Sequence, residues 1–368
     1  MRPRSARVGS YVLLVALSLL GVLGAVEIAV RLSPRPLSDL SPLHVLRPEK
    51  PWLFGLRPLA RHAIAGADGE YVINADGFRG APLERKREGT FRIVLLGDSL
   101  TFGWSVRDEE TLGRQLEHQL TSWSQGASVE VLNLGVSGYN PYTEANWLAE
   151  MAARVEPDLV LVQFCVNDLN DPTLHFDYAT HAPIDFPDDA LPDPARRPPP
   201  PSLGVRLCSL SRACSLLRKR FPSRVDQVRA LEAVAPHGDP SPAELTWLGE
   251  QYGEMASIAG KHGAKFGIVV FPYSTQLEPK AATTLQDDLR ELGRERGWPV
   301  VDLLPAYREA HATTPTDALY IDLWHPTAAG FRIAGDALAT SVACSGLAPV
   351  KPPAEVCATD GTGHGSDR

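Results

Sequence analysis

Five short apolar runs separated by helical patterns constrain the fold of this chain more than any other feature. The runs are rich in β-branched residues and nearly free of polar ones: 91–96, 129–134, 159–164, 266–271 and 300–303. Strands buried on both faces of a parallel sheet have this pattern. Helical patterns fall between the runs, around 109–123, 142–155, 243–262, 280–296 and 326–342. This succession predicts an open α/β sheet with a mainly parallel set of strands and right-handed crossovers.

The loops after the first three runs carry residues that can do chemistry. In an open α/β sheet, ligands bind beyond the carboxyl ends of the strands. The first run is followed by Gly97–Leu100 (GDSL), a tight exit from which the Ser99 hydroxyl can project into a cleft. The second is followed by Gly135 and Gly138, which permit close backbone approach, and the third by the amide of Asn167. Taken singly, each of these is a weak signal, because Gly-Asp-Ser also suits an ordinary turn, and asparagine and glycine after a strand are mostly turn formers.

Near the end of the chain, His325 stands three residues after Asp322. Of the ten histidines, it is the only one with an acidic residue at that spacing. Pro326 suits the first position of a helix, so the pair should lie on the loop that opens the last helix. There the carboxylate can hold Nδ1 of the imidazole and leave Nε2 free as a base. A surface histidine beside a helix cap is the alternative.

In order and spacing, these four pieces resemble the SGNH, or GDSL-type, hydrolase family. The GDSL tetrapeptide matches Gly97–Leu100 fully, the terminal DxxH matches Asp322 and His325, and the resemblance covers about residues 90–343. It implies a flavodoxin-like, three-layer α/β/α sandwich around a five-stranded sheet, the SGNH hydrolase fold. It also implies an enzyme that cleaves ester bonds.

The resemblance assigns a role to each candidate residue. Ser99 is similar to the family's nucleophile and His325 to its general base, which Asp322 would orient. The oxyanion hole would consist of the backbone N–H groups of Ser99 and Gly138 and the side-chain amide of Asn167. Such donors stabilise the negative charge that develops on a tetrahedral intermediate.

Gly138 and Cys165 are the two positions at which the match to the family's pattern is less direct. Gly138 is preferred to Gly135 because the family's glycine falls five residues after the asparagine that ends the strand, here Asn133. The third block is usually Gly-x-Asn-Asp, but Cys165 stands at the glycine position, which puts the backbone geometry beside Asn167 in question. We expect the Cys165 thiol to be a small buried hydrophobe, because no histidine is near it in sequence.

Residues 1–31 are predicted to form an N-terminal signal anchor, a transmembrane helix. The 19 residues 8–26 carry no charge and follow three arginines. A helix of that length approaches the roughly 30 Å of bilayer hydrocarbon. A cleaved signal peptide is the alternative, although no convincing small-x-small cleavage site follows. The preceding arginines favour a cytoplasmic N-terminus, so the rest of the chain would be periplasmic or extracellular, although further arginines follow the segment.

The remaining chain is expected to comprise a Pro-rich neck (32–89), a hydrolase domain (90–343) and a flexible tail (344–368). In the neck, the sequence around Gly77 predicts a short strand and turn that pack on the main domain. Within the hydrolase domain, residues 168–242 form a Pro-rich and basic insertion. Its residues 206–224 predict an amphipathic helix that docks on the core, covers the active site as a lid or contacts anionic lipid.

Composition excludes several classes of partner. With 44 acidic and 36 basic residues, the net charge of −8 argues against a nucleic-acid surface. The cysteines show no CxxC pair and no Cys/His ligand spacing, so neither a metal nor another cofactor is expected.

Cys208 with Cys214, and Cys344 with Cys357, can form disulfides in an oxidising compartment. Scattered reduced thiols are the alternative.

These features together predict a membrane-anchored serine esterase that acts outside the cytoplasm through an acyl-serine intermediate. The substrate would be a small-molecule, glycan or lipid ester, for example an O-acetyl group. An O-acyltransferase that uses the same residues on a cell-envelope glycan is one alternative. A catalytically silent binding module is another, which loss of the nucleophile or the base would indicate.

Overall fold

The structure, a computed structural model, describes residues 4–32, 43–47, 49–64, 68–124, 126, 128–169, 208, 211, 213–214 and 240–359. The chain divides into two units. The larger comprises residues 37–197 and 233–368, and the smaller comprises residues 1–36 and 198–232. The predicted amphipathic helix at 206–224 falls almost wholly outside the described residues.

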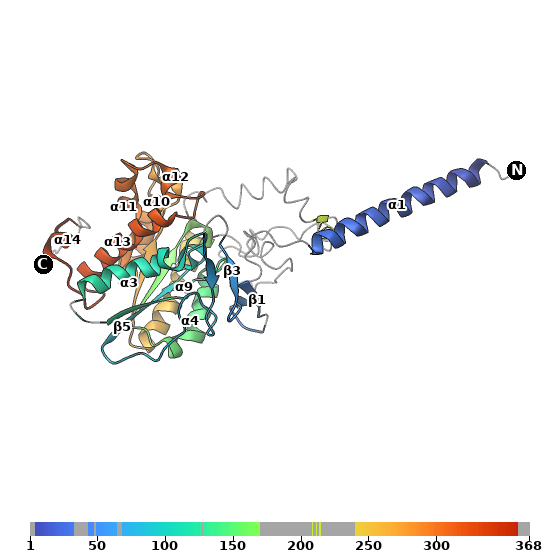
Figure 1. Cartoon of the computed structure of the whole chain (residues 1–368). Helices are drawn as coiled ribbons and strands as arrows, with labels where there is room; N and C mark the ends of the chain where they lie inside the picture. The colour runs from blue at the N-terminus through green and yellow to red at the C-terminus, as the bar shows by residue number, and fades with distance from the viewer. Residues whose placement is uncertain are drawn as a thin grey trace. The chain divides into compact units, whose positions relative to one another are not determined.

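A five-stranded sheet forms the centre of the larger unit (Figure 1). Its strands are β5 (Thr90–Leu96), β6 (Ser128–Asn133), β7 (Leu159–Phe164), β8 (Lys265–Val270) and β9 (Val300–Asp302). They are all parallel, in the order β6-β5-β7-β8-β9. Every residue of β7 is buried, as expected for a strand covered on both faces. The predicted parallel α/β sheet is confirmed.

Helices cover both faces of this sheet. The main ones are α3 (Leu112–Trp123), α4 (Pro141–Val155), α9 (Pro242–Lys261), α10 (Thr284–Arg296) and α13 (Ala328–Cys344). Helix α3 packs beside α13, and α4 packs beside α9 (Figure 1). Because β5 lies between β6 and β7, right-handed crossovers place the β5–β6 helix on one face and the β6–β7 helix on the other. This is the expected three-layer α/β/α arrangement.

Several short helices were not predicted from the sequence. They are α2 (Ser99–Phe102), α11 (Leu304–His311), α12 (Thr316–Leu319) and the 3₁₀ turns η2 (Asp108–Glu110), η3 (Val166–Leu169) and η6 (Ser274–Leu277). Most of them are three or four residues long, which is too short for a helical repeat to show in the sequence. Of these, α2 and η3 follow β5 and β7 directly.

The neck contains two small antiparallel sheets where one strand and turn were predicted. Strand β1 (His44–Leu46) pairs with β2 (Phe54–Leu56), and β3 (Arg61–Ala63) pairs with β4 (Glu70–Val72). The predicted turn is present, with Gly77 at φ 85°. The aromatic side chains of Phe54, Tyr71 and Phe78 are buried in the same core as the central sheet. The neck is therefore part of the packed unit.

The segment after Cys344, expected to be a flexible tail, differs from that expectation as far as Thr359. It contains α14 (Ala354–Thr359) and the disulfide Cys344–Cys357. Leu347 and Val350 are buried, because the chain turns back onto the domain after α13. Residues 360–368 lie outside the described residues.

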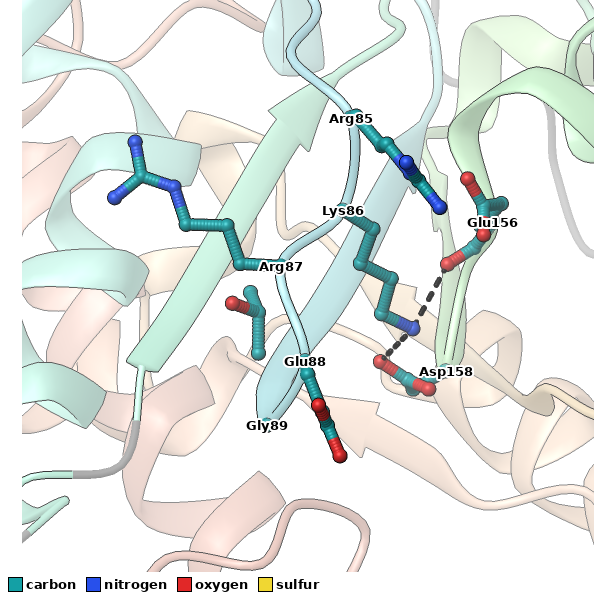
Figure 2. Close-up of a pocket in the computed structure, with 8 residues that line it drawn as sticks. Arg85, Lys86, Arg87, Glu88, Gly89, Glu156 and Asp158 are labelled. Atoms are coloured by element: carbon teal, nitrogen blue, oxygen red, sulfur yellow. Dashed lines mark hydrogen bonds and ion pairs between the residues drawn. The ribbon is translucent and has the colours of Figure 1, made fainter.

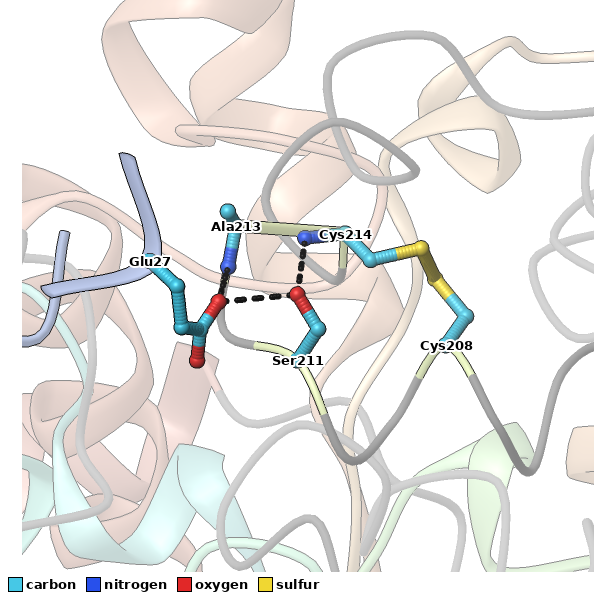
Figure 3. The surroundings of a disulfide bond; sticks show 5 residues. All are labelled: Glu27, Cys208, Ser211, Ala213 and Cys214. Atoms are coloured by element: carbon cyan, nitrogen blue, oxygen red, sulfur yellow. Dashed lines mark hydrogen bonds between the residues drawn. A yellow bond between two sulfur atoms is a disulfide. The ribbon is translucent and has the colours of Figure 1, made fainter. Parts of the chain in front are cut away.

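In the smaller unit the structure describes α1 (Arg4–Leu32) and four residues of the insertion. Within α1, Leu13–Leu32 is long and apolar enough to cross a membrane. The carboxylate of Glu27 accepts hydrogen bonds from Ser211 Oγ at 2.8 Å and from the backbone N–H of Ala213 at 3.0 Å (Figure 3). These two residues lie inside the loop closed by the disulfide Cys208–Cys214. The disulfide loop is thus attached to the last turns of α1.

Candidate active site

The tight exit from β5 sets the position of Ser99. Asp98 caps α2 by accepting a hydrogen bond from the backbone N–H of Leu100 at 2.9 Å, so Ser99 becomes the first residue of the helix. Gly97 has φ 152°, and a Cβ there would collide with the side chains of Thr101 and Gln163. The glycine and the cap therefore turn the chain sharply, and leave Ser99 at the carboxyl edge of the sheet.

His325 and Asp322 meet Ser99 from the loop before α13. Ser99 Oγ lies 2.9 Å from His325 Nε2. His325 Nδ1 lies 2.8 Å from one oxygen of Asp322 and 3.0 Å from the other. The three residues predicted from the sequence thus form one continuous hydrogen-bonded chain.

Backbone contacts of Asp322 keep its carboxylate in place. Its Oδ1 accepts hydrogen bonds at 2.8 Å from the backbone N–H groups of Trp324 and His325. Partial burial favours the neutral acid, but the hydrogen bonds and charge of His325, with the Trp324 N–H, outweigh it and lower the pKa of Asp322. An ionised carboxylate at Nδ1 favours the tautomer whose Nε2 can accept the Ser99 proton.

The two backbone donors assigned to the oxyanion hole make no other hydrogen bond within the part of the chain that the structure describes. Among the described residues, the N–H groups of Ser99 and Gly138 have no hydrogen-bond acceptor. The loop that holds Gly138 is tied to β5, since Val136 N–H donates to Gly97 O at 3.0 Å. Gly138 has φ 91°, a conformation that side chains disfavour. Gly135 has another role, because a Cβ there would collide with backbone atoms of Thr101 and Phe102.

Asn167 is in the turn η3 beyond β7, but its side chain lies outside what the structure describes. Two hydrogen bonds hold the backbone on either side of it. Asp168 accepts a hydrogen bond from Cys165 N–H at 2.9 Å and returns one from its own N–H to Cys165 O at 2.9 Å. Cys165 is buried, as expected, and lies outside the disulfides, and it accommodates this turn without a glycine.

Buried acids behind the site were not predicted from the sequence. Glu144 and Asp168 are almost fully buried. Both oxygens of Glu144, one of Asp168 and the hydroxyl of Tyr252 have no partner among the described residues. Burial, followed by the charge of Asp98, raises the pKa of Glu144 well above its usual range. Burial also raises the pKa of Asp168, with further contributions from Glu144 and Asp98.

Trp104 is a second residue that the sequence did not point to. Its ring lies against the imidazole of His325, with ring centroids 4.5 Å apart and an interplanar angle of 42°. The loop between α2 and η2 carries it, five residues after Ser99. Only the GDSL motif marks this region in the sequence, and that motif says nothing of the tryptophan that follows it.

A surface hollow of about 760 Å³ is found at the other end of the sheet (Figure 2). It is lined by residues 85–90, Glu156 and Asp158. Lys86 donates to the backbone carbonyl of Glu156 at 3.0 Å and pairs with Asp158 at 2.6 Å. Lys86 in this hollow is already paired with Asp158, and no histidine lines the hollow to activate a nucleophile. The hollow is therefore not the reactive site. Within the described ranges, no cluster of three or more potential ligands fits a metal ion.

A five-stranded parallel sheet with helices on both faces, and a hydrogen-bonded Ser99–His325–Asp322 chain at its carboxyl edge, is the architecture of SGNH-type hydrolases. The profile of the GDSL-like lipase/acylhydrolase family matches residues 95–333. The chain belongs to this family, and is a hydrolase that acts on ester bonds.

Solved structures with a similar fold have low sequence identity to the chain. LAE5, an alpha/beta hydrolase enzyme from the metagenome of Lake Arreo, is 16% identical over 69% of this chain and 95% of its own, with a TM-score of 0.40. Axe2, an acetylxylan esterase from Geobacillus stearothermophilus, is 15% identical over 68% and 94%, with a TM-score of 0.41. TesA is 14% identical over 70% and 99%, with a TM-score of 0.42. A comparison with curated proteins found no significant match. None of these likenesses bears on the substrate.

Proposed function

We propose that the protein is a serine esterase in which Ser99 is the nucleophile, His325 the general base and Asp322 the residue that orients it. The observation that supports this best is the continuous contact from Ser99 Oγ through His325 to the Asp322 carboxylate. A serine hydroxyl is a poor nucleophile until a base takes its proton, and this contact supplies the base. It also speaks against a silent binding module, since such a module has no need of the contact.

The first half of the reaction transfers the acyl group to the enzyme. Ser99 Oγ attacks the ester carbonyl carbon while its proton passes to His325 Nε2. The carbonyl oxygen becomes an oxyanion, which accepts hydrogen bonds from the backbone N–H groups of Ser99 and Gly138 and, by our assignment, the Asn167 amide. When the intermediate collapses, the C–O bond to the alcohol breaks, and the alcohol leaves with the proton from His325.

The second half releases the acyl group. Water gives a proton to His325 and attacks the acyl-serine carbonyl, and collapse returns that proton to Ser99 Oγ and frees the acid. A sugar hydroxyl in place of water would give an acylated sugar by the same steps. The two outcomes share every residue of the site, so the acceptor that reaches the acyl-enzyme decides between them.

We further propose that α1 anchors the enzyme in a membrane, with the larger unit outside the cytoplasm. The length and apolarity of Leu13–Leu32 support a spanning helix. The disulfides Cys208–Cys214 and Cys344–Cys357 support an oxidising compartment. An enzyme anchored outside the cytoplasm has access to O-acetylated glycans and lipid esters, and these are the substrate classes we propose.

The first test is hydrolysis of a short-chain aryl acetate by the detergent-solubilised full chain. Ser99→Ala should reduce turnover by roughly a thousandfold or more. The control is Ser128→Ala, an exposed serine at the start of β6 that should retain full activity. Equal activity of Ser99→Ala and the wild type would disprove the serine mechanism. Adding a glycan acceptor tests for the transferase, which would form acylated glycan in preference to free acetate.

A further inference from the structure

The loop that places Trp104 beside His325 has an unusual backbone. Gly103 and Ser105, on either side of Trp104, both have left-handed conformations, with φ 81° and 62°. Glycine adopts such angles freely, whereas for serine they are costly. A non-glycine residue keeps this conformation only where surrounding contacts enforce it. The contacts that do so come from the neck.

Arg79 makes most of these contacts. Its guanidinium donates to the backbone carbonyls of Phe102 at 2.9 Å, Gly103 at 2.6 Å and Val106 at 2.7 Å. The side chain is only 2% exposed, and its nearest carboxylate is Asp108 at 3.8 Å. Burying a positive charge without a carboxylate in hydrogen-bonding contact costs free energy. Burial also lowers the pKa of Arg79. The three carbonyls are the main compensation for that cost.

Tyr71 also holds the loop that carries Trp104. Its hydroxyl accepts a hydrogen bond at 2.7 Å from the backbone N–H of Ser105, the strained residue. The Arg79 guanidinium lies over the rings of Tyr71 and Phe102, at 4.9 and 5.2 Å from their centroids. Arginine guanidinium groups occupy such positions over aromatic rings more often than lysine ammonium groups do. Loop residues 102–106 are therefore held by two neck residues that act together.

We propose that Arg79 is a positioning residue for ester hydrolysis: it holds loop 102–106 so that the Trp104 ring packs against His325 and keeps the imidazole directed at Ser99. The inference rests on the proposed function, because it needs His325 to be the base. Arg79 itself does not touch the substrate or the reacting atoms. Its effect is transmitted by the backbone of Gly103 and Ser105 and by the ring of Trp104.

Arg92 provides a matched control for the test. It is 1% exposed and, like Arg79, uses its guanidinium to make three contacts: to Glu130 at 2.7 Å, to Val155 O at 2.7 Å and to Glu84 O at 3.0 Å. It is on β5 towards the end away from Gly97. Arg79→Lys and Arg92→Lys thus remove comparable buried contacts, near the candidate site in one case and far from it in the other.

The measurement is turnover of an aryl acetate by the full-length variants, at a temperature where circular dichroism shows both to be folded. Arg79→Lys should lose about 10- to 100-fold, mainly in kcat, because a small displacement of a catalytic group has a large effect on rate. Arg92→Lys should stay within about threefold of the wild type. Equal losses in the two variants would overturn the inference.

A double-mutant cycle tests the route through Trp104. Trp104→Ala should itself lower kcat, and adding Arg79→Lys to it should then cost less than about threefold. If the ring does not transmit the effect, Arg79→Lys will cost as much in the Trp104→Ala background as in the wild type. That result would also overturn the proposal.

Tyr71→Phe is the milder variant if Arg79→Lys does not fold. It removes one hydrogen bond to Ser105 and keeps the ring, so we expect a kcat loss of about 3- to 10-fold with little change in KM. An unchanged kcat would contradict the inference. Ser99→Ala distinguishes failure of the proposed function from failure of this inference. If Ser99→Ala is active, the serine mechanism itself fails. If Ser99→Ala is inactive and Arg79→Lys loses no more activity than Arg92→Lys, only the positioning role of Arg79 fails.

Discussion

The carboxylate of Asp322 decides which tautomer of His325 is favoured. It accepts from the Trp324 and His325 backbone N–H groups and from His325 Nδ1. In Asp322→Asn the amide NH₂ faces Nδ1 and favours the opposite tautomer, whose Nε2 carries a proton and cannot accept one from Ser99. We expect kcat to fall by about 10²- to 10⁴-fold with the fold unchanged. Steady-state kinetics check this, with Asp158→Asn at the far end of the sheet as the control. A variant with normal kcat would show that Asp322 does not orient the base.

Glu144 ties the stability of the protein to pH. The folded state raises its pKa through burial and the charge of Asp98, so folded protein retains a proton that unfolded protein releases. The free energy of unfolding should therefore fall as pH rises from the ordinary pKa of a glutamate, about 4.3, towards the raised folded value. Below that window the shift has no effect on stability.

Glu144→Gln should remove this share of the pH dependence. Relative to the wild type, the variant should gain stability as pH rises through the same window. A smaller slope should remain in the variant, because burial still raises the pKa of Asp168. Urea unfolding from pH 4 to pH 8 measures the difference. Parallel curves for the two proteins would mean that Glu144 is ionised at no cost in the folded state.

Among the elements, the sequence identified those whose pattern is continuous or long. Strand β7 (Leu159–Phe164) is wholly apolar except for Gln163, and α9 extends over 20 residues. Of the three-residue strands of the neck, only β4, beside the predicted turn, was expected. The others were missed because their pairing depends on backbone contacts between separate segments and leaves no periodicity. Helix α2 was missed because four residues after a glycine read as a turn.

The site was predictable to the extent that motifs mark it. Gly97–Leu100 and the Asp322/His325 pair are local signatures, and the structure brings them together. Trp104, Glu144 and Arg79 carry no such signature. A buried arginine in particular contradicts the usual exposure of charged residues, and only the three-dimensional contacts explain it.

The chain after α13 is held to the domain by its disulfide. Cys344 and Cys357 are 13 residues apart, and in the chain-entropy account a loop of that size is worth about 3 kcal/mol. We expect Cys344→Ser/Cys357→Ser to lower the free energy of unfolding by about that amount, with little change in esterase turnover. Chemical denaturation measures the first and an aryl ester assay the second. Unchanged stability would mean that this bond does not form in the native protein.

For the whole molecule, α1 predicts how the protein fractionates. If Leu13–Leu32 spans a bilayer, intact protein should remain with membranes through salt and high-pH washes and be released only by detergent. A matched truncated chain, residues 33–368, should be recovered without detergent. Release of the full chain by a high-pH wash would contradict a spanning helix and point to a peripheral or cleaved segment.

The central claim is that Ser99 carries the acyl group. The most direct measurement is to trap the intermediate by rapid acid quench during turnover of an aryl acetate, and to locate the adduct by peptide mass spectrometry. We predict a single acetyl group on the peptide that contains Ser99. This adduct should be absent from Ser99→Ala. In a variant that lacks His325, the adduct should accumulate only when the substrate is highly activated. An adduct on another residue, or turnover with no acyl-enzyme and an active Ser99→Ala, would contradict the account.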